Sequence, residues 1–317
     1  MNINGAIMKF FKYILLFFGI LFFNGCSNNT NNIQQMNLLA SSLNNSVKDG
    51  EKLAKILLFI VKHYQLIWKD GYAICRILEA CCEILTDDDS VNDLSILLFK
   101  LSFDKDPKKE NDRKDLAMTG LNSVRGVAAE SSIILFNNLL ENDIEPPELL
   151  FYLLKRFSRD SVKGVRSSIL RRLAYTLYKK PELGWQLFED IFRDSENTLW
   201  RYSHSCFYYQ YYENFDKVKP YLERLIQESP NEAGEIWANI FSLAYLSNYV
   251  SEDELFFNLE NINSEKAWEG AIHVFIANID KKENNQPCES ALLRAISIKM
   301  LSKDRIRQIE FLFGDHK

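Results

Sequence analysis

Apolar residues recur at every third or fourth position through most of the chain after residue 50, with polar residues between them. A clear example is the series Leu53, Ile56, Leu57, Ile60, Val61, Tyr64 and Ile67. This spacing places the apolar side chains on one face of an amphipathic α-helix. We find no sustained alternation of apolar and polar residues, which a half-buried β-strand would show. The pattern therefore predicts an all-α fold.

Two stretches of the chain repeat one pattern at a period of about 40 residues. The first begins SVRGVAAESS at Ser123 and the second begins DSVKGVRSSI at Asp160, so that Arg125 aligns with Arg166. A cap residue, a Val-Arg pair and then regularly spaced apolar residues are typical of the inner helix of a HEAT-like repeat. We therefore predict an α-solenoid of HEAT-like helical hairpins over 116–317. Arg125 and Arg166 are expected to be structural, each bracing the neighbouring repeat by pairing with an aspartate such as Asp160.

Capping residues and prolines indicate where the predicted helices begin and end. The acidic run at 87–89 and Ser90 supply caps for a helix that continues to Leu101. Prolines 146 and 147 open another helix, and Pro181 ends the inner helix of the second repeat. The segment 121–141 has apolar residues on two stripes and is expected to be buried on two faces. The spine of the second inner helix is expected to consist of Val165, Ile169, Leu173 and Leu177.

The charged loop 104–115 is the expected internal boundary. It separates an N-terminal helical region, 36–103, from the repeat region. Before these, residues 1–25 have the pattern of a secretory signal, with Lys9 and Lys12 followed by a short apolar run. That run is too short for a membrane-spanning helix, which needs about 20 residues.

The end of this signal, FFNGC, resembles the lipobox of bacterial lipoproteins, in which a cysteine after the cleavage site carries the lipid. Gly25 and Cys26 fit that pattern, whereas Phe23 and Asn24 depart from it. The resemblance implies attachment of lipid, including palmitate, at Cys26, followed by a polar tether over 26–35. A start at Met8, and an apolar beginning of the first helix in place of a signal, both stay open.

A second resemblance covers 121 to about 300, a little over half of the chain. The segments SVRGVAAES, DSVKGVRSSI, FDKVKPYLERLI and WANIFSLAYL resemble the C-terminal helical-repeat region of antiviral STAND NTPases. In that family the region is the sensor that grips a foreign protein. The chain has no G-x-x-x-x-G-K-[ST] loop, so the resemblance implies a recognition surface without an ATPase.

Composition and the remaining side chains favour binding over catalysis. The formal net charge is −5, which gives no global indication of nucleic acid as a partner. The four histidines are scattered, no nucleophile elbow or metal-binding motif is present, and no cofactor or small-molecule substrate is indicated. Glu79 and Glu83, one helical turn apart, are interpreted as solvated carboxylates. Apart from Cys26 the cysteines are odd in number and are interpreted as small buried apolar residues: Cys75, Cys81, Cys82, Cys206 and Cys288.

Two local features are candidate partner-binding surfaces. The segment 155–180 is strongly basic, and within it Arg159, Lys163 and Arg172 are the candidates for contacting an acidic surface. The aromatic run at 207–212 is the second feature, in which Phe207 and Tyr211 are expected in the core. Tyr208 and Tyr212 are the candidates to meet a partner.

Together these observations predict a non-enzymatic lipoprotein of the bacterial cell envelope. It is held at the membrane by its N-terminal lipid and binds a partner protein through an α-solenoid surface. The alternative is a cytosolic sensor fragment that resembles the recognition region of an antiviral STAND NTPase. A third possibility is an enzyme whose site is assembled between distant helices.

Overall fold

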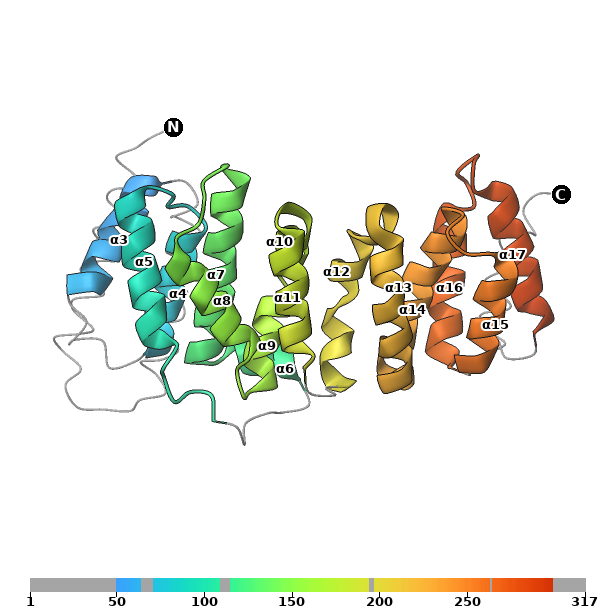
Figure 1. Ribbon diagram of the computed structural model, residues 1–317, viewed down its shortest axis with the longest axis horizontal. Helices are drawn as coiled ribbons and strands as arrows, with labels where there is room; N and C mark the ends of the chain where they lie inside the picture. The colour runs from blue at the N-terminus through green and yellow to red at the C-terminus, as the bar shows by residue number, and fades with distance from the viewer. Residues whose placement is uncertain (1–49, 64–70, 109–114, 194–196, 263, 299–317) are drawn as a thin grey trace, which may run out of the picture. The chain divides into compact units, whose positions relative to one another are not determined.

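The computed structural model describes residues 50–63, 71–108, 115–193, 197–262 and 264–298. Within these ranges the regular structure consists of helices joined by short turns, and no strand occurs (Figure 1). The predicted all-α class is therefore confirmed. The chain divides into two compact units between Arg172 and Leu173, which we call the first unit and the second unit. The lipid-attachment residue Cys26, the tether and the signal lie outside the described residues.

The first unit is built around one long helix. In order its helices are α3 (Glu51–His63), α4 (Gly71–Cys82), α5 (Asp88–Leu101), α6 (Leu116–Leu121), α7 (Val124–Glu141), α8 (Glu148–Ser158) and α9 (Lys163–Leu170). Helix α7 packs against α4, α5, α6, α8 and α9. Its buried residues include Val127, Ile133, Leu135, Phe136 and Leu139, which lie on more than one face. The predicted burial of this segment on two faces is confirmed.

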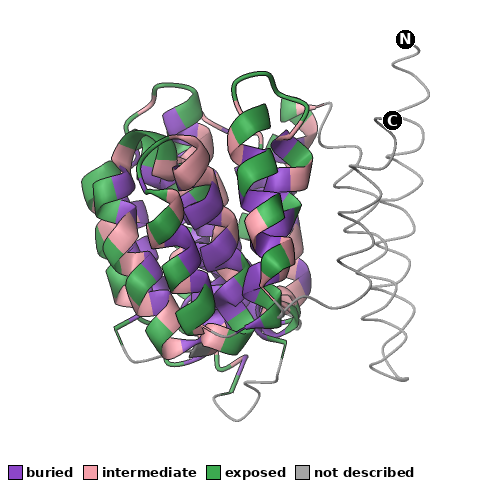
Figure 2. Cartoon of the chain, turned by 90° about the vertical axis from the view of Figure 1, so that its right-hand side faces the viewer, coloured by how far each residue is buried: buried purple, intermediate pink, exposed green. Residues whose placement is uncertain are grey.

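The second unit has a core rich in aromatic residues. Its elements are α10 (Leu173–Lys179), α11 (Pro181–Ile191), η2 (Asn197–Tyr202), α12 (His204–Tyr208), α13 (Tyr211–Glu228), α14 (Pro230–Leu246), α15 (Glu252–Ile262), α16 (Glu265–Asn278) and α17 (Asn285–Ser297). Helices α14 and α16 make its most extensive packing. Trp200 stacks on Phe192 with ring centroids 3.9 Å apart, and Trp237 stacks on Phe241 at 4.6 Å. Figure 2 shows the buried residues on the inward sides of the helices and the exposed residues on the outward sides.

Several predicted helix ends are confirmed. The side chain of Asp87 caps α5 by accepting a hydrogen bond from the backbone N–H of Ser90 at 3.2 Å. Pro147 is the N-cap residue of α8, and Pro181 opens α11 after α10 has ended at Lys179.

Helices α7 and α14 each end in a turn of the same type. In α7, Ile144 N donates to Leu139 O and Asp143 N donates to Leu140 O. In α14, Tyr249 N donates to Ala244 O and Asn248 N donates to Tyr245 O. This is the bonding pattern of a Schellman motif, which needs a left-handed residue after the helix. Asp143 (φ 56°) and Asn248 (φ 63°) occupy that position, where glycine is the commonest residue.

One helix starts later than predicted and another is broken. The predicted helix 121–141 is present from Val124 onward as α7; Leu121 ends α6, and the chain turns at Asn122 before Ser123 acts as N-cap. The predicted spine from Val165 to Leu177 is divided between α9 and α10. The carbonyl of Arg172 accepts a hydrogen bond at 3.0 Å from the side-chain amide of Asn137 on α7. This bond directs the Arg172 carbonyl toward α7, and Arg172 lies at the point where the predicted helix is interrupted.

The described cysteines are all free and buried: Cys75, Cys81, Cys82, Cys206 and Cys288. The interpretation of these residues as small core side chains is confirmed. Burial raises the pKa of the Cys81 thiol and of the Cys206 thiol to about 12, which keeps both in the unreactive thiol form at neutral pH. Among the helices that the structure describes, none combines the length and apolar composition that a membrane span requires.

Candidate functional site

The predicted structural arginines lie in the interior of the first unit. Arg125 Nε and Nη2 donate to the two carboxylate oxygens of Asp160 at 2.9 and 3.2 Å, and Nη1 donates to the carbonyl of Asp104 at 2.7 Å. The same carboxylate accepts the backbone N–H of Val162 at 2.8 Å, at the start of α9. Arg125 therefore ties the N-terminus of α7 to the turn that begins α9. Arg166 is among the largest fully buried side chains and is only 2% exposed.

A second charged group in this unit was not predicted. Glu130, on α7, is 1% exposed, and its two oxygens accept from Arg171 at 2.9 Å and from Arg172 at 3.0 Å. On α4, Glu79 lies against Arg76, whose Nη1 is 2.6 Å from a carboxylate oxygen. We call these five side chains the buried charge cluster. Its signal in the sequence was Glu130, a single carboxylate within an apolar helix, which needs a partner when buried.

Glu79 corrects the interpretation of the 79/83 pair as solvated. Glu83 is exposed, but Glu79 is only 8% exposed. Desolvation by burial raises the pKa of the Glu79 carboxyl to about 7; the nearby positive charge of Arg76 lowers it and the negative charge of Glu130 raises it further. The cost of burying the charge therefore exceeds the attraction of the ion pair. Glu79 is therefore a buried carboxyl in the interior of the first unit.

These contacts reduce the basic surface that the sequence predicted. Arg172 is committed to Glu130, although half of its side chain remains exposed. Arg156 donates to the hydroxyl and the carbonyl of Ser102 and covers the ring of Phe103 at 4.0 Å. Arg159 and Lys163, at the junction of α8 and α9, also interact within the chain. Much of the positive charge between 155 and 180 therefore serves the fold.

The predicted tyrosines form the more open surface, and they belong to the second unit. The chain leaves α12 at Tyr208, turns through Gln210 and enters α13 at Tyr211 (Figure 1). Phe207 is fully buried, as predicted, and Tyr211 is half-buried. Tyr208, Tyr209 and Tyr212 are 44%, 66% and 66% exposed. The sequence-predicted candidates Tyr208 and Tyr212 are thus outward-facing, whereas the predicted basic residues lie in the other unit.

The exposed rings are in contact with one another. Tyr208 makes an edge contact with Tyr209 at 5.3 Å and a tilted contact with Tyr211 at 6.3 Å, and Tyr211 in turn meets Tyr212 at 6.3 Å. Sequence reasoning missed Tyr249, which the Schellman turn after α14 brings to this group. Its hydroxyl donates to the carbonyl of Tyr212, and its ring stacks on Phe215 at 5.4 Å. We call Tyr208, Tyr209, Tyr211, Tyr212 and Tyr249 the tyrosine surface.

Neighbouring side chains hold the tyrosine surface in place. Gln210 is 2% exposed, and its side-chain oxygen accepts from Asn214 at 3.2 Å, where α13 departs from helical geometry. His204 stacks on Tyr208 with centroids 5.6 Å apart. Burial raises the pKa of the Tyr211 hydroxyl above its usual value, which keeps that hydroxyl neutral. These contacts restrict the tyrosine side chains before any partner binds. The side chains would therefore lose little conformational entropy on binding.

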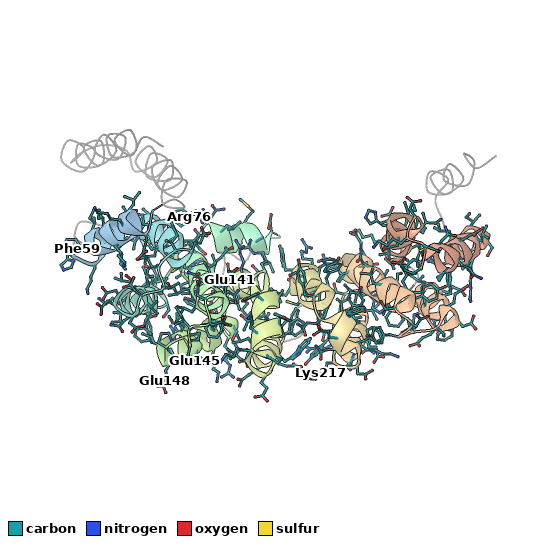
Figure 3. All side chains as sticks on the ribbon, turned by 90° about the horizontal axis from the view of Figure 1, so that it is seen from above. Phe59, Arg76, Glu141, Glu145, Glu148 and Lys217 are labelled. Carbon is teal, nitrogen blue, oxygen red and sulfur yellow. The ribbon has the colours of Figure 1, made fainter. Side chains whose placement is uncertain are left out.

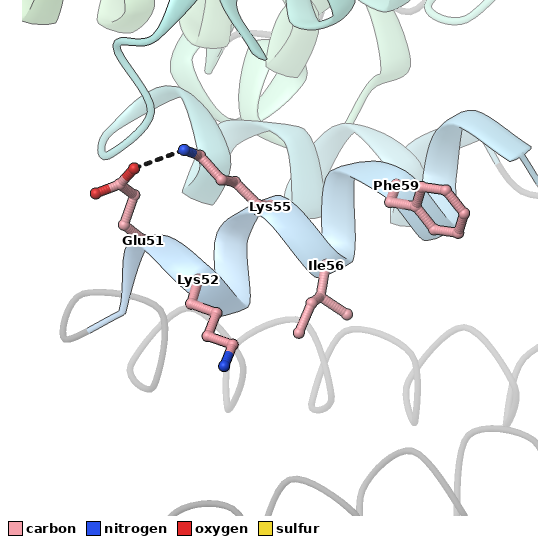
Figure 4. A pocket seen from close by; sticks show the side chains of 5 residues that line it. All are labelled: Glu51, Lys52, Lys55, Ile56 and Phe59. Atoms are coloured by element: carbon pink, nitrogen blue, oxygen red, sulfur yellow. Dashed lines mark ion pairs between the residues drawn. The ribbon is translucent and has the colours of Figure 1, made fainter. Parts of the chain in front are cut away.

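The hollows in the structure are less suitable as sites. One lies along the outer face of α3 and is lined by Glu51, Lys52, Lys55, Ile56 and Phe59, with the Glu51–Lys55 ion pair at 2.7 Å (Figure 4). Another is lined by residues on either side of the 109–114 gap, among them Asp106, Asp115 and Asn122. Neither hollow is lined by a residue of the tyrosine surface. Within those ranges no group of three or more His, Cys, Asp and Glu residues is arranged to hold a metal ion.

No protein-family description, curated protein or solved structure matches the chain.

Proposed function

We propose that this protein is a non-enzymatic binding protein that recognises a partner protein through the tyrosine surface of its second unit. The observation that carries the proposal is the exposure of Tyr208, Tyr209 and Tyr212 on an ordered support. Tyrosine supplies large contact area with few rotatable bonds and is enriched at binding hot spots. Tyrosine rings that are exposed to water contribute little to the stability of the isolated chain. Burying the same rings against a partner stabilises a complex.

We further propose that the helices form an α-solenoid of HEAT-like hairpins. Two features support this arrangement in the first unit. Helices pack mainly on helices close to them in sequence, as in a stack of repeats. The Arg125–Asp160 pair joins the two stretches that share one pattern, in the manner expected of repeats braced by arginine. A solenoid exposes a long surface relative to its core and is suited to recognition.

The proposed location is the bacterial cell envelope, with lipid on Cys26 holding the protein at a membrane. The support is the pattern of the first 26 residues. Metabolic labelling with a tagged fatty acid, combined with membrane fractionation, tests this directly. We expect label and membrane association in the wild type and loss of both in Cys26→Ala. A soluble, unlabelled wild type would favour the cytosolic sensor fragment instead.

Site-specific crosslinking tests the binding proposal. A photoreactive benzoyl-phenylalanine replaces Tyr209 in the native host, and the same residue replaces Tyr178 as the control. Tyr178 is 58% exposed and lies in the same unit, outside the tyrosine surface. We expect a discrete adduct from position 209, absent from position 178 and lost when Tyr208→Ala and Tyr212→Ala are added. Equal adducts from both positions would refute the assignment.

A further inference from the structure

Among the described residues, no cation lies over the faces of the exposed tyrosines. Elsewhere the described residues place guanidinium groups over aromatic rings: Arg294 lies 4.5 Å from the ring centre of Phe256, and Arg224 lies 5.6 Å from that of Trp200. No such contact occurs at Tyr208, Tyr209 or Tyr212 within the described part of the chain. Tyr209 and Tyr212 are each 66% exposed, so that their rings are accessible to an external ammonium or guanidinium group, whereas His204 stacks on one face of Tyr208.

The charges beside the tyrosine surface favour the same kind of ligand. Glu213 and Asp216, on the first turns of α13, are exposed and form no ion pair with a described residue. Tyr249 is followed closely by the acidic first turn of α15, residues 252–254. All three are paired within the second unit: Glu252 and Asp253 with Arg294 at 3.4 and 2.8 Å, and Glu254 with Lys219 at 2.7 Å. Among the described residues, the unpaired negative charge beside the tyrosine surface is therefore that of Glu213 and Asp216.

The exposed Lys217 is the opposing charge next to Glu213 and Asp216 (Figure 3). Further along α13, Lys219 and Arg224 pair with Glu254 and Glu228. Lys217 offsets one of the two unpaired carboxylates and leaves the surface negative. The described residues of the second unit as a whole carry more acidic than basic side chains. Complementary potential guides an oppositely charged partner to a surface and repels one of like charge. An acidic segment is therefore disfavoured here.

We propose that the tyrosine surface binds a cationic segment of its partner, with arginine or lysine side chains placed over the rings of Tyr208, Tyr209 and Tyr212. Glu213 and Asp216 then face the remaining positive charges. This inference rests on the proposed function and specifies the chemistry of the partner. A single cation over an exposed tyrosine face contributes little affinity, so several must act together to give measurable binding.

Peptide binding to the full chain carrying Cys26→Ala tests this chemistry. The probe is a labelled twelve-residue peptide of alternating arginine and glycine. Its matched controls replace arginine with citrulline, which keeps the shape but removes the charge, or with glutamate. We expect the arginine peptide to bind, and the citrulline and glutamate peptides to bind at least about tenfold more weakly. Fluorescence anisotropy at two salt concentrations measures both affinity and its electrostatic component.

Variants of the protein distinguish the contribution of the tyrosine rings to peptide binding from that of the acidic side chains. We expect Tyr208→Leu with Tyr212→Leu, which keeps apolar area but removes the aromatic faces, to weaken arginine-peptide binding about tenfold. Tyr178→Leu, the exposed control, leaves it unchanged. Glu213→Gln with Asp216→Asn reduces affinity and lowers its salt dependence. Circular dichroism confirms that each variant is folded before binding is compared.

Two results would overturn the inference. One is arginine-peptide binding that is absent or indifferent to the tyrosine variants, and the other is tighter binding of an uncharged proline–glycine peptide of equal length. The crosslinking experiment distinguishes failure of this inference from failure of the binding function. If position 209 captures a partner but mass spectrometry locates the adduct in a segment without arginine or lysine, the cationic inference fails while the binding function stands. If position 209 captures nothing, the binding function itself fails.

Discussion

Arg125 and Asp160 form a two-pronged ion pair between residues 35 positions apart in the chain. Their side chains are only 12% and 11% exposed. The third guanidinium nitrogen is occupied by the carbonyl of Asp104, and Asp160 also accepts the N–H of Val162. The Arg125 side chain therefore satisfies polar groups of two other segments of the first unit, the loop at Asp104 and the turn at Asp160. Lysine cannot reproduce this because it lacks the planar fork.

Removing this arginine is expected to destabilise the protein strongly. Arg125→Ala leaves the Asp160 carboxylate largely buried without its partner, at a cost of about 3 kcal/mol. Arg125→Lys should recover only part of the loss. The matched control is Lys62→Ala, which breaks an exposed pair with Asp93 and should cost about 0.5 kcal/mol or less. Urea unfolding followed by far-ultraviolet circular dichroism gives these values. Equal losses in Arg125→Ala and Lys62→Ala would contradict a bracing role.

The sequence pattern was sufficient to predict the all-α class of the fold and several ends of helices. Periodicity identified the helices. Asp87 was correctly assigned to a helix start and Pro181 to the end of the helix before it, because capping and termination depend on neighbours in sequence. The break after Leu170 could not be found in the same way. It depends on Asn137 and Glu130, which reach the segment from another helix.

The candidate site was predictable in part for the same reason. An aromatic run at helical spacing must direct some rings outward, so Tyr208 and Tyr212 could be identified from their neighbours. Tyr249 joins them through a left-handed turn at Asn248, a tertiary contact with no local signal. Glu79 was misjudged because the burial of a helix face depends on which helix covers it.

Close packing of three glycines gives a second prediction. A Cβ atom on Gly126 would lie 2.1 Å from the carbonyl oxygen of Gly120, and one on Gly164 would lie 2.8 Å from the side chain of Thr119. The backbones of α6, α7 and α9 approach so closely that a methyl group cannot fit without moving a helix. We expect Gly126→Ala to lower the free energy of unfolding by about 2–3 kcal/mol.

Gly234→Ala provides the control for this effect. Its added Cβ would meet the hydroxyl of Ser264 at 3.1 Å, which is a side-chain atom able to rotate away. Alanine also favours the helical state over glycine by up to about 1 kcal/mol. We therefore expect Gly234→Ala to be close to neutral. A thermal or urea unfolding series that ranks Gly126→Ala as the milder change would show that α6 and α7 do not pack as described.

The division of the aromatic run between core and surface gives a third prediction. Phe207 is fully buried, and truncation to alanine should cost about 3–5 kcal/mol of stability. Tyr208→Ala with Tyr212→Ala removes exposed rings and should cost less than about 1 kcal/mol. Urea unfolding measures both, and the same samples serve in the crosslinking experiment. A large loss in the double variant would mean that these tyrosines support the fold, so their effect on binding could no longer be assigned to contact with a partner.

Glu79 makes the stability of the first unit dependent on pH. A glutamate in the unfolded chain titrates near 4.3, whereas burial raises the pKa of Glu79 in the folded state to about 7. The folded state therefore binds this proton more tightly than the unfolded state does. The stabilisation is complete at low pH and is lost as the pH rises from about 4.5 through 7.

Glu79→Gln removes this titration and tests it. Relative to the wild type, the variant should gain stability as the pH is raised from 5 to 8, on the order of 2 kcal/mol across the window. The charged groups that act on Glu79 are Arg76, Glu83, Glu130 and Arg172, and they are unchanged in the variant. Glu141→Gln, at an exposed position on α7 that is not among these groups, is the control and should follow the wild-type profile. Parallel curves for the wild type and Glu79→Gln from pH 5 to pH 8 would show that the Glu79 carboxyl is solvated and that α4 does not pack against α7 as described.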